Sequence, residues 1–175
     1  MTLANYLPDF ALEAVYDLTV DDLKKHGIRA VLVDLDNTLI AWNNPDGTAE
    51  MRSWLHRMRD AGIIIIVVSN NTTNRVRRAV EKFGIDYVAW AMKPFNYGIK
   101  KAMKRYGLKP EETVMVGDQL MTDIRASHRA GIRSILVKPL VQHDSNKTKF
   151  NRWREGRVLK KLEAQKRPIH FKKTL

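Results

Sequence analysis

Short apolar runs alternate along the chain with longer segments in which apolar residues recur at helical spacing. The run at 63–68 is continuous and β-branched, which is typical of a strand buried on both faces of a parallel sheet. Four further runs are interpreted as strands, at 28–34, 85–89, 113–116 and 132–137. Five strands separated by helices predict an α/β fold, a three-layer sandwich built on a five-stranded parallel sheet with right-handed crossovers.

The segments between these runs carry helix signals of their own. Thr19 is suited to cap a short helix that Gly27 would end. Thr48 is a candidate cap for a second helix, in which Met51 and Met58 share one face. Each of these helices therefore has an apolar side that can pack on the sheet.

Length and composition predict one core domain with an extension on either side. A chain of 175 residues with 44% apolar content is long enough for one hydrophobic core and short for two. We assign 1–27 to an N-terminal extension with a short helix, 28–140 to the core domain and 141–175 to a basic C-terminal extension. Within the last part, 142–149 is interpreted as a polar linker and 153–164 as a helix.

The chain is strongly basic, with a formal net charge of +12, and much of the excess lies after residue 142. This charge favours an anionic partner or surface. Cysteine is absent, which excludes disulfides, thiolate metal sites and cysteine nucleophiles and fits a reducing cytoplasm. The longest purely apolar run, at 63–68, is far shorter than the about 20 residues that cross a bilayer. We therefore expect a cytoplasmic protein, either soluble or peripheral at a membrane.

Polar side chains stand at the ends of successive predicted strands, where open parallel sheets bind their ligands. They are Asp34 and Asp36 after the first strand, Ser69 and Asn70 after the second, Lys93 after the third, and Asp118 and Asp123 after the fourth. Two carboxylates two residues apart repel one another and are costly to bury without a cation. Magnesium prefers carboxylate and carbonyl oxygens and keeps substrate phosphates among its ligands, so the pattern predicts a Mg²⁺ site.

Each of these positions also has a simpler interpretation when it is taken alone. Asp-Asn-Thr at 36–38 is ordinary turn chemistry, and Ser69 could cap the next helix. Lys93 could be a solvated lysine, and Asp118 and Asp123 could flank a helix N-terminus. Their coincidence at one edge of the predicted sheet favours a catalytic site.

Four motifs at these positions resemble those of the haloacid dehalogenase (HAD) superfamily. The first, Asp-x-Asp-x-Thr, is matched at 34–38, the second by Ser69, the third by Lys93, and the fourth, Gly-Asp-x-x-x-x-Asp, at 117–123. The resemblance covers 28–138 and implies a Rossmann-like sheet in a HAD-like core. Phosphatases of the superfamily have the second acid of the first motif, which halide-removing members usually lack. Asp36 therefore implies a hydrolase that acts on a phosphate monoester.

The resemblance implies a direct role for three of the acids. Asp34 is expected to be the nucleophile that forms an aspartyl-phosphate, and Asp36 the general acid and then the general base. The carboxylates of Asp34 and Asp118, with the backbone carbonyl of Asp36, are expected to hold Mg²⁺.

The remaining motif residues are implied to bind the phosphate or to support the metal ligands. Lys93 is both catalytic and substrate-binding, because its charge offsets that of the nucleophile and the phosphate. Ser69, Asn70 and Thr38 are expected to bind the phosphate group. Thr38 and Asp123 are also expected to orient the groups around the metal.

Little room is left for a cap domain, the insertion that usually sets substrate choice in this superfamily. One loop and one helix fill 38–63, and one helix and one strand fill 69–93. This resembles the capless subclass III A, whose open sites suit macromolecular or membrane-borne phosphates or gain a lid through homo-oligomers. The residues at 6–9, 23–29 and 34–39 are similar to the bacterial YqeG group, which is related to phosphatidylglycerophosphate phosphatases.

Two functions of different classes follow. The first is a Mg²⁺-dependent phosphatase that acts on phosphatidylglycerophosphate at an anionic membrane surface, where an apolar N-terminal set would lie unless it packs on the sheet. That set comprises Leu3, Tyr6, Leu7, Phe10 and Leu12. The second is a nucleic-acid- or ribosome-associated protein, whose activity is vestigial or directed at a polynucleotide end, because basic residues surround Phe150 and Trp153.

Overall fold

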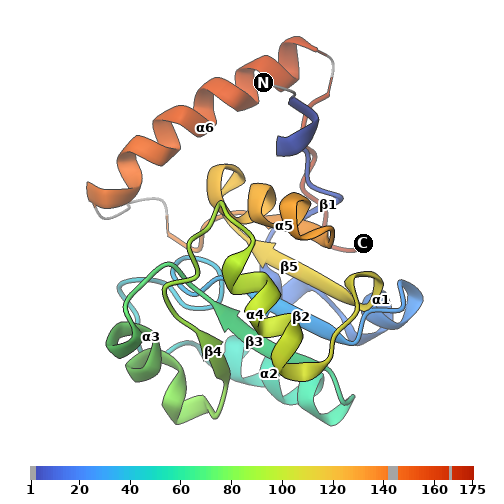
Figure 1. Ribbon diagram of the computed structural model, residues 1–175, viewed down its shortest axis with the longest axis vertical. Coiled ribbons are helices and arrows are strands. Elements are labelled where there is room, and N and C mark those ends of the chain that lie inside the picture. Colours follow the sequence, from blue (N-terminus) through green and yellow to red (C-terminus); the bar gives the residue numbers. More distant parts are fainter. Residues whose placement is uncertain (1–2, 142–145, 166) are drawn as a thin grey trace.

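A six-stranded sheet, in which all paired strands are parallel, forms the middle layer of the protein (Figure 1). The computed structural model describes residues 3–141, 146–165 and 167–175. The strands lie in the order β1-β6-β5-β2-β3-β4, so β2 lies between β5 and β3. Their bounds are β1 (Phe10–Leu12), β2 (Ala30–Val33), β3 (Ile64–Val68), β4 (Asp86–Val88), β5 (Thr113–Gly117) and β6 (Arg133–Val137).

Helices cover both faces of the sheet and complete the three predicted layers. On one face, Val31 and Val33 of β2 share a core with Leu55 and Val76 from two helices. On the other face, Leu32 of β2 belongs to a second core. The side chains of β2 therefore alternate between two cores, as the pleat of a strand requires. The helices are α1 (Val20–Lys25), α2 (Ala49–Asp60), α3 (Thr73–Val80), α4 (Tyr97–Tyr106), α5 (Arg125–Ala130) and α6 (Asn146–Ala164).

The sheet has one strand more than the five that the sequence pattern predicts. The additional strand, β1, pairs in parallel with β6. Asp9, just before β1, accepts hydrogen bonds from the backbone N–H of Ser134 at 2.8 Å and from its hydroxyl at 3.0 Å. A strand of three residues is too short to show alternation, and this one depends on a partner far along the chain. Residues assigned to an N-terminal extension therefore supply an edge strand.

The apolar N-terminal set divides between the core and the surface. Tyr6 and Leu12 are buried, whereas Leu3, Leu7 and Phe10 are half-buried. Packing on the sheet, the alternative to a membrane contact, thus accounts for Tyr6 and Leu12. Among the residues that the structure describes, no helix is long and apolar enough to cross a membrane.

The helix ends follow the capping signals in the sequence. The hydroxyl of Thr19 accepts the N–H of Asp22 at 3.1 Å, and that of Thr48 accepts the N–H of Met51 at 3.1 Å. Gly107 ends α4 at a φ of 59°, in the left-handed region that glycine adopts without strain.

α6 begins earlier than the sequence predicts. The linker predicted at 142–149 is wrong from Asn146 onward, where the helix starts, and 142–145 lie outside the described residues. Lysine is a good helix former, so the polar composition of this stretch is compatible with a helix. Figure 1 shows α6 outside the three layers, beside the N-terminal segment.

One acid and a few apolar side chains hold α6 to the core. Leu162 is fully buried, and Val158 packs against an apolar cluster that includes Met121. The carboxylate of Glu155, a residue only 7% exposed, accepts the backbone N–H of Met121 at 3.3 Å. Burial raises the pKa of Glu155 to about 7. The helix thereby docks on η5 (Leu120–Ile124), the π-helical turn after β5.

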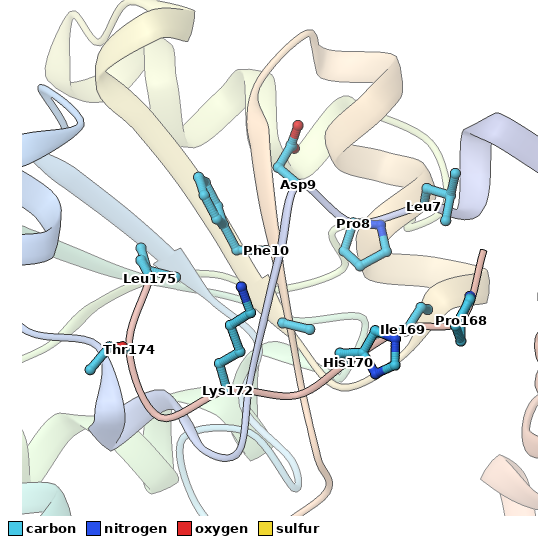
Figure 2. A pocket seen from close by; sticks show the side chains of 11 residues that line it. Leu7, Pro8, Asp9, Phe10, Pro168, Ile169, His170, Lys172, Thr174 and Leu175 are labelled. Atoms are coloured by element: carbon cyan, nitrogen blue, oxygen red, sulfur yellow. The ribbon is translucent and has the colours of Figure 1, made fainter. Parts of the chain in front are cut away.

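The segment 167–175 runs beside β1. The N–H of Lys172 donates to the carbonyl of Ala11 at 2.9 Å, and the carbonyl of Lys172 accepts the N–H of Glu13 at 3.0 Å. Between 168–175 and 7–11 lies a cavity of about 390 Å³ (Figure 2). Its lining includes none of the predicted site residues, so we assign it no part in the chemistry.

Glu155→Gln should change how stability depends on pH. The folded state raises the pKa of Glu155 to about 7 from 4.5, so it binds an extra proton between these values and loses stability as pH rises through them. Glutamine stays neutral and still accepts the bond from Met121. We expect the melting temperature of the variant to rise relative to the wild type between about pH 5 and pH 8 in thermal unfolding. Glu163→Gln, exposed on the same helix, is the control, and parallel pH profiles for all three proteins would contradict the burial of Glu155.

Gly117→Ala should destabilise the end of β5. A Cβ at residue 117 would lie 2.2 Å from Cγ of Asp123, far inside van der Waals contact. The substitution must displace Asp123 or the strand, and we expect a loss of about 1–3 kcal/mol in chemical denaturation. Gly156→Ala, in α6, is the matched control, because its Cβ meets no atom within 4 Å and should be neutral or stabilising. Unchanged stability of Gly117→Ala would show that Asp123 does not pack there.

Candidate active site

The order of the strands brings the four predicted motifs to one edge of the sheet. Val33 of β2 lies in register with Val67 of β3 on one side and with Val116 of β5 on the other. The residues that follow these three strands therefore emerge side by side at their carboxyl ends. The first, second and fourth motifs all lie in these positions.

Lys93 is a buried cation held between two carboxylates. Its Nζ lies 2.7 Å from Oδ1 of Asp34 and 2.6 Å from Oδ1 of Asp123, and its side chain is 2% exposed. Burial lowers the pKa of Lys93, but the charges of Asp123 and Asp34 raise it by more, so the net shift is upward. The lysine is therefore charged at physiological pH, and its interpretation as a solvated lysine is wrong.

The backbone of Lys93 is held by the side-chain amide of Asn70. Nδ2 of Asn70 donates to the carbonyl of Lys93 at 2.8 Å, and Oδ1 accepts the N–H of Lys93 at 2.8 Å. This pair of bonds ties the loop after β4 to the end of β3. Asn70 thus positions the lysine, while its contact with a substrate phosphate stays a prediction.

Ser69 is buried and does not cap the next helix. Thr72 caps α3 instead, by accepting the N–H of Arg75 at 3.4 Å. Oγ of Ser69, a residue 3% exposed, accepts the N–H of Asn71 at 3.1 Å. A serine hydroxyl that accepts one bond still has a proton to donate, which suits a phosphate-binding residue.

Asp118 contacts two residues from distant parts of the chain. Thr38 donates to its Oδ1 at 3.1 Å, and the guanidinium of Arg152 in α6 lies 3.3 Å from its Oδ2. Burial, and then the charges of Asp34 and Asp123, raise the pKa of Asp118 well above its usual range. A carboxylate that is destabilised as an anion in this way favours a nearby cation.

Three buried carboxylates form an acid cluster that fits a divalent metal ion. Asp34, Asp118 and Asp123 each offer an oxygen within 4.8 Å of the others. The metal ligands predicted from the motifs are the carboxylates of Asp34 and Asp118 and the backbone carbonyl of Asp36, whereas Asp123 is expected to support these ligands. Both oxygens of Asp123 accept hydrogen bonds, one from the buried lysine and one from the N–H of Gln119 at 3.1 Å, which is compatible with the supporting role. The hard oxygen donors and the excess of negative charge suit Mg²⁺.

Asp36 lies outside this acid cluster. Its carboxylate accepts hydrogen bonds from Nδ2 of Asn71 at 2.6 Å and from Arg75 at 2.9 Å, and its side chain is 30% exposed. Burial, and then the charge of Asp34, raise its pKa, whereas Arg75 and Asn71 lower it. An acid with a raised pKa that is open to solvent is suited to proton transfer.

Sequence reasoning missed three residues of the site, namely Asn71, Arg75 and Arg152. The first two lie within six residues of Ser69, and nothing in the sequence distinguishes them from the polar residues that are common at the start of a helix. Arg152 comes from the C-terminal extension, where the only signal was an excess of basic residues. No spacing rule connects it with Asp118.

The loop that carries Lys93 also exposes three large apolar side chains, which we call the apolar rim. They are Trp90, Met92 and Phe95, with 59%, 58% and 59% of the residue exposed. Trp90 and Met92 have φ values of 51° and 58°, in the left-handed region that bulky residues rarely adopt. Such backbone strain persists only where the surroundings enforce it, and it gathers at functional sites. The motifs identified only the lysine of this loop.

Comparison with known proteins finds relatives along most of the chain. A family model described as haloacid dehalogenase-like hydrolase matches residues 15–131. The chain is 36% identical over 160 residues to the "Probable phosphatase YqeG" of Bacillus subtilis. This alignment covers 91% of this chain and 93% of that protein. It is 26% identical over 143 residues to "Phosphatidylglycerophosphate phosphatase 1, chloroplastic/mitochondrial" of Arabidopsis thaliana, across 77% of this chain and 41% of that protein.

A solved structure shares the fold. The cobalt-bound form of the deoxy-D-mannose-octulosonate 8-phosphate phosphatase (YrbI) from Haemophilus influenzae aligns with a TM-score of 0.53 at 20% identity, over 81% of this chain and 91% of that chain. At this identity the likeness concerns the fold alone. Because the family model spans more than half of the chain and the Bacillus relative aligns along nearly all of it, the chain belongs to the haloacid dehalogenase-like hydrolases.

Proposed function

We propose that this hydrolase is a Mg²⁺-dependent phosphatase that cleaves a phosphate monoester through an aspartyl-phosphate on Asp34. The observation that carries the proposal is the acid cluster, in which two of the three carboxylates are paired with a buried lysine. Of its three acids Asp34 is the most accessible, with a side chain 12% exposed against 1% for both Asp118 and Asp123. The phosphatase name of the Bacillus relative supports the reaction class.

Four side chains would divide the work of the transfer. Lys93 holds one oxygen of Asp34 and leaves the other for in-line attack on phosphorus. Its charge also offsets the charge that develops on the phosphoryl oxygens, to which Ser69 donates a hydrogen bond. Asp36 donates a proton to the leaving alcohol. It then accepts a proton from the water that breaks the bond between Asp34 and phosphorus.

Mg²⁺ would be held by the carboxylates of Asp34 and Asp118 and by the backbone carbonyl of Asp36. When bound, it supplies positive charge beside the phosphate. Thr38 and Asp123 would not bind the metal ion but would orient the groups around it. Thr38 bonds to Asp118, and Asp123 bonds to the buried lysine.

The substrate we favour is phosphatidylglycerophosphate, a lipid phosphate at an anionic membrane surface. The Arabidopsis relative carries that name, although this chain spans less than half of its length. Within the described residues only α2 and loops lie between β2 and β3, so no cap domain covers the site there. The apolar rim supplies the surface that would meet the bilayer, because aromatic side chains favour the boundary between hydrocarbon and water.

The nucleic-acid- or ribosome-associated alternative stays a prediction, as do the cytoplasmic location and a homo-oligomer. The side chain of Phe150 lies outside the described part of the protein. Trp153 is 58% exposed, and the guanidinium of Arg157 lies 4.8 Å from the centre of its ring. A ring with an arginine over one face has less surface for stacking on bases.

A screen of phosphate esters with Mg²⁺ tests the reaction class and the substrate together. Asp34→Asn keeps the shape of the nucleophile but cannot form the acyl-phosphate, so phosphate release should fall by a factor on the order of 1,000 or more. Asp21→Asn, at an exposed position in α1, should keep the wild-type rate. Turnover by Asp34→Asn at the wild-type rate would exclude Asp34 as the nucleophile.

Replacing the apolar rim should separate lipid substrates from soluble ones. Trp90→Ser combined with Phe95→Ser removes apolar area that would enter the bilayer surface. We expect phosphate release from phosphatidylglycerophosphate in anionic vesicles, and sedimentation with those vesicles, to fall about tenfold or more. Hydrolysis of the best soluble ester should stay within about twofold.

The control for this experiment is Tyr106→Ser, which is exposed at the end of α4 that leads away from the site. It should leave both activities unchanged. An equal fall on the lipid and on the soluble ester would mean that the rim supports the structure of the site. Equal vesicle activity of all three proteins would remove the rim as a membrane contact.

A further inference from the structure

α6 brings an arginine to the edge of the acid cluster. The guanidinium of Arg152 lies 3.3 Å from Oδ2 of Asp118, and 28% of its side chain is exposed. The other oxygen of Asp118 accepts a hydrogen bond from Thr38. Arg152 is therefore next to a proposed metal ligand and is also open to a molecule that enters the site.

The position of Arg152 is also supported by contacts of α6 that other residues make. Glu155, three residues later, accepts the N–H of Met121, and Leu162 is 0% exposed. Residues three apart lie on the same side of a helix, so the docking that buries Glu155 also turns Arg152 toward the end of β5. In Figure 1, α6 lies outside the layer that contains α5.

The charge of the site depends on this arginine. The four motif aspartates, at 34, 36, 118 and 123, are paired with three cations, Lys93, Arg75 and Arg152. With all four acids ionised and a divalent metal ion present, the site carries one net positive charge, and with a proton on Asp36 it carries two. Arg152 supplies one of these positive charges in either case. A phosphate monoester carries close to two negative charges at neutral pH. Arg152 therefore makes the site attractive to the substrate.

We propose that Arg152 is a substrate-binding residue, which pairs with Asp118 in the absence of metal and with the substrate phosphate once a divalent cation binds Asp118. This inference rests on the proposed function. Two cations that share one carboxylate repel each other, and an oxyanion placed between them relieves that repulsion. Arginine suits the position, because its planar guanidinium binds two phosphate oxygens at once.

The proposal gives Arg152 opposite effects on the two ligands. It competes with the metal ion for Asp118, so its removal should leave Mg²⁺ binding unchanged or make it tighter. It assists the phosphate, so its removal should weaken phosphate binding. A residue that merely held Asp118 in place would weaken the metal ion instead.

The experiment measures both affinities on the full chain by isothermal titration. Mg²⁺ is titrated alone, and inorganic phosphate is titrated in saturating Mg²⁺. The proteins are the wild type, Arg152→Gln, Arg152→Lys and Lys160→Gln, which removes the same charge from an exposed position on α6. Thermal unfolding of each variant checks that the helix remains docked.

For Arg152→Gln we expect the Kd of phosphate to rise about tenfold or more, with unchanged or tighter Mg²⁺ binding. Arg152→Lys should recover part of the loss, and Lys160→Gln should stay within about twofold of the wild type. For the best ester, KM should rise with the Kd of phosphate, while kcat changes less.

A change of less than twofold in phosphate affinity, weaker Mg²⁺ binding, or an equal loss in Lys160→Gln would each overturn the role of Arg152. The titrations need no turnover, so they also separate this inference from the proposed function. If the wild type hydrolyses no ester yet binds phosphate through Arg152, the proposed function fails and the anion-binding role stands. If esters are hydrolysed and Arg152→Gln binds phosphate normally, the proposed function stands and the role of Arg152 fails.

Discussion

The ion pairs of Lys93 with Asp34 and Asp123 are the interaction on which the rest of the site depends. Three carboxylates this close and this buried would repel one another and take up protons if no cation lay among them. The charge of the lysine offsets the charges of two of them, Asp34 and Asp123, away from water. Several neighbouring features serve to keep it there, including the paired hydrogen bonds from Asn70 and the glycine at 117 that leaves room for Asp123.

The same constraint explains why the chemistry is shared among distant elements. β2 lies between β3 and β5, and the residues that follow it, 34–39, include no lysine or arginine. The positive charge arrives from loops and helices outside these strands, as Lys93 after β4, Arg75 in α3 and Arg152 in α6. Each contact ties one more segment to the centre of the sheet edge. The ion pairs that hold these segments together are therefore also the ones that set the charge of the site.

The sequence predicted the elements that have a periodic apolar pattern and the charged residues of the motifs. It did not predict the features that depend on tertiary contacts. The buried strands and the motif residues at their ends could be predicted, because a β-branched run indicates a strand buried on both faces, and polar residues that follow such strands mark the ligand-binding edge of a parallel sheet. β1 could not, since three residues show no period and their partner lies in β6. Arg152 could not either, because its role comes from the way α6 docks through Glu155. The apolar rim was hidden because an apolar residue beside a strand usually belongs to the core.

The two edges of the sheet are closed in different ways. Beside β1, the backbone of Lys172 forms hydrogen bonds with the backbone of Ala11 and Glu13, groups that would otherwise face solvent. At β4, the side chain of Asp86 binds Arg105 and Tyr106, which places a charged cluster along a strand of only three residues. Open edges are where strands of separate molecules join and begin to aggregate. These contacts therefore oppose the continuation of one sheet into the next when copies of this protein meet at high concentration.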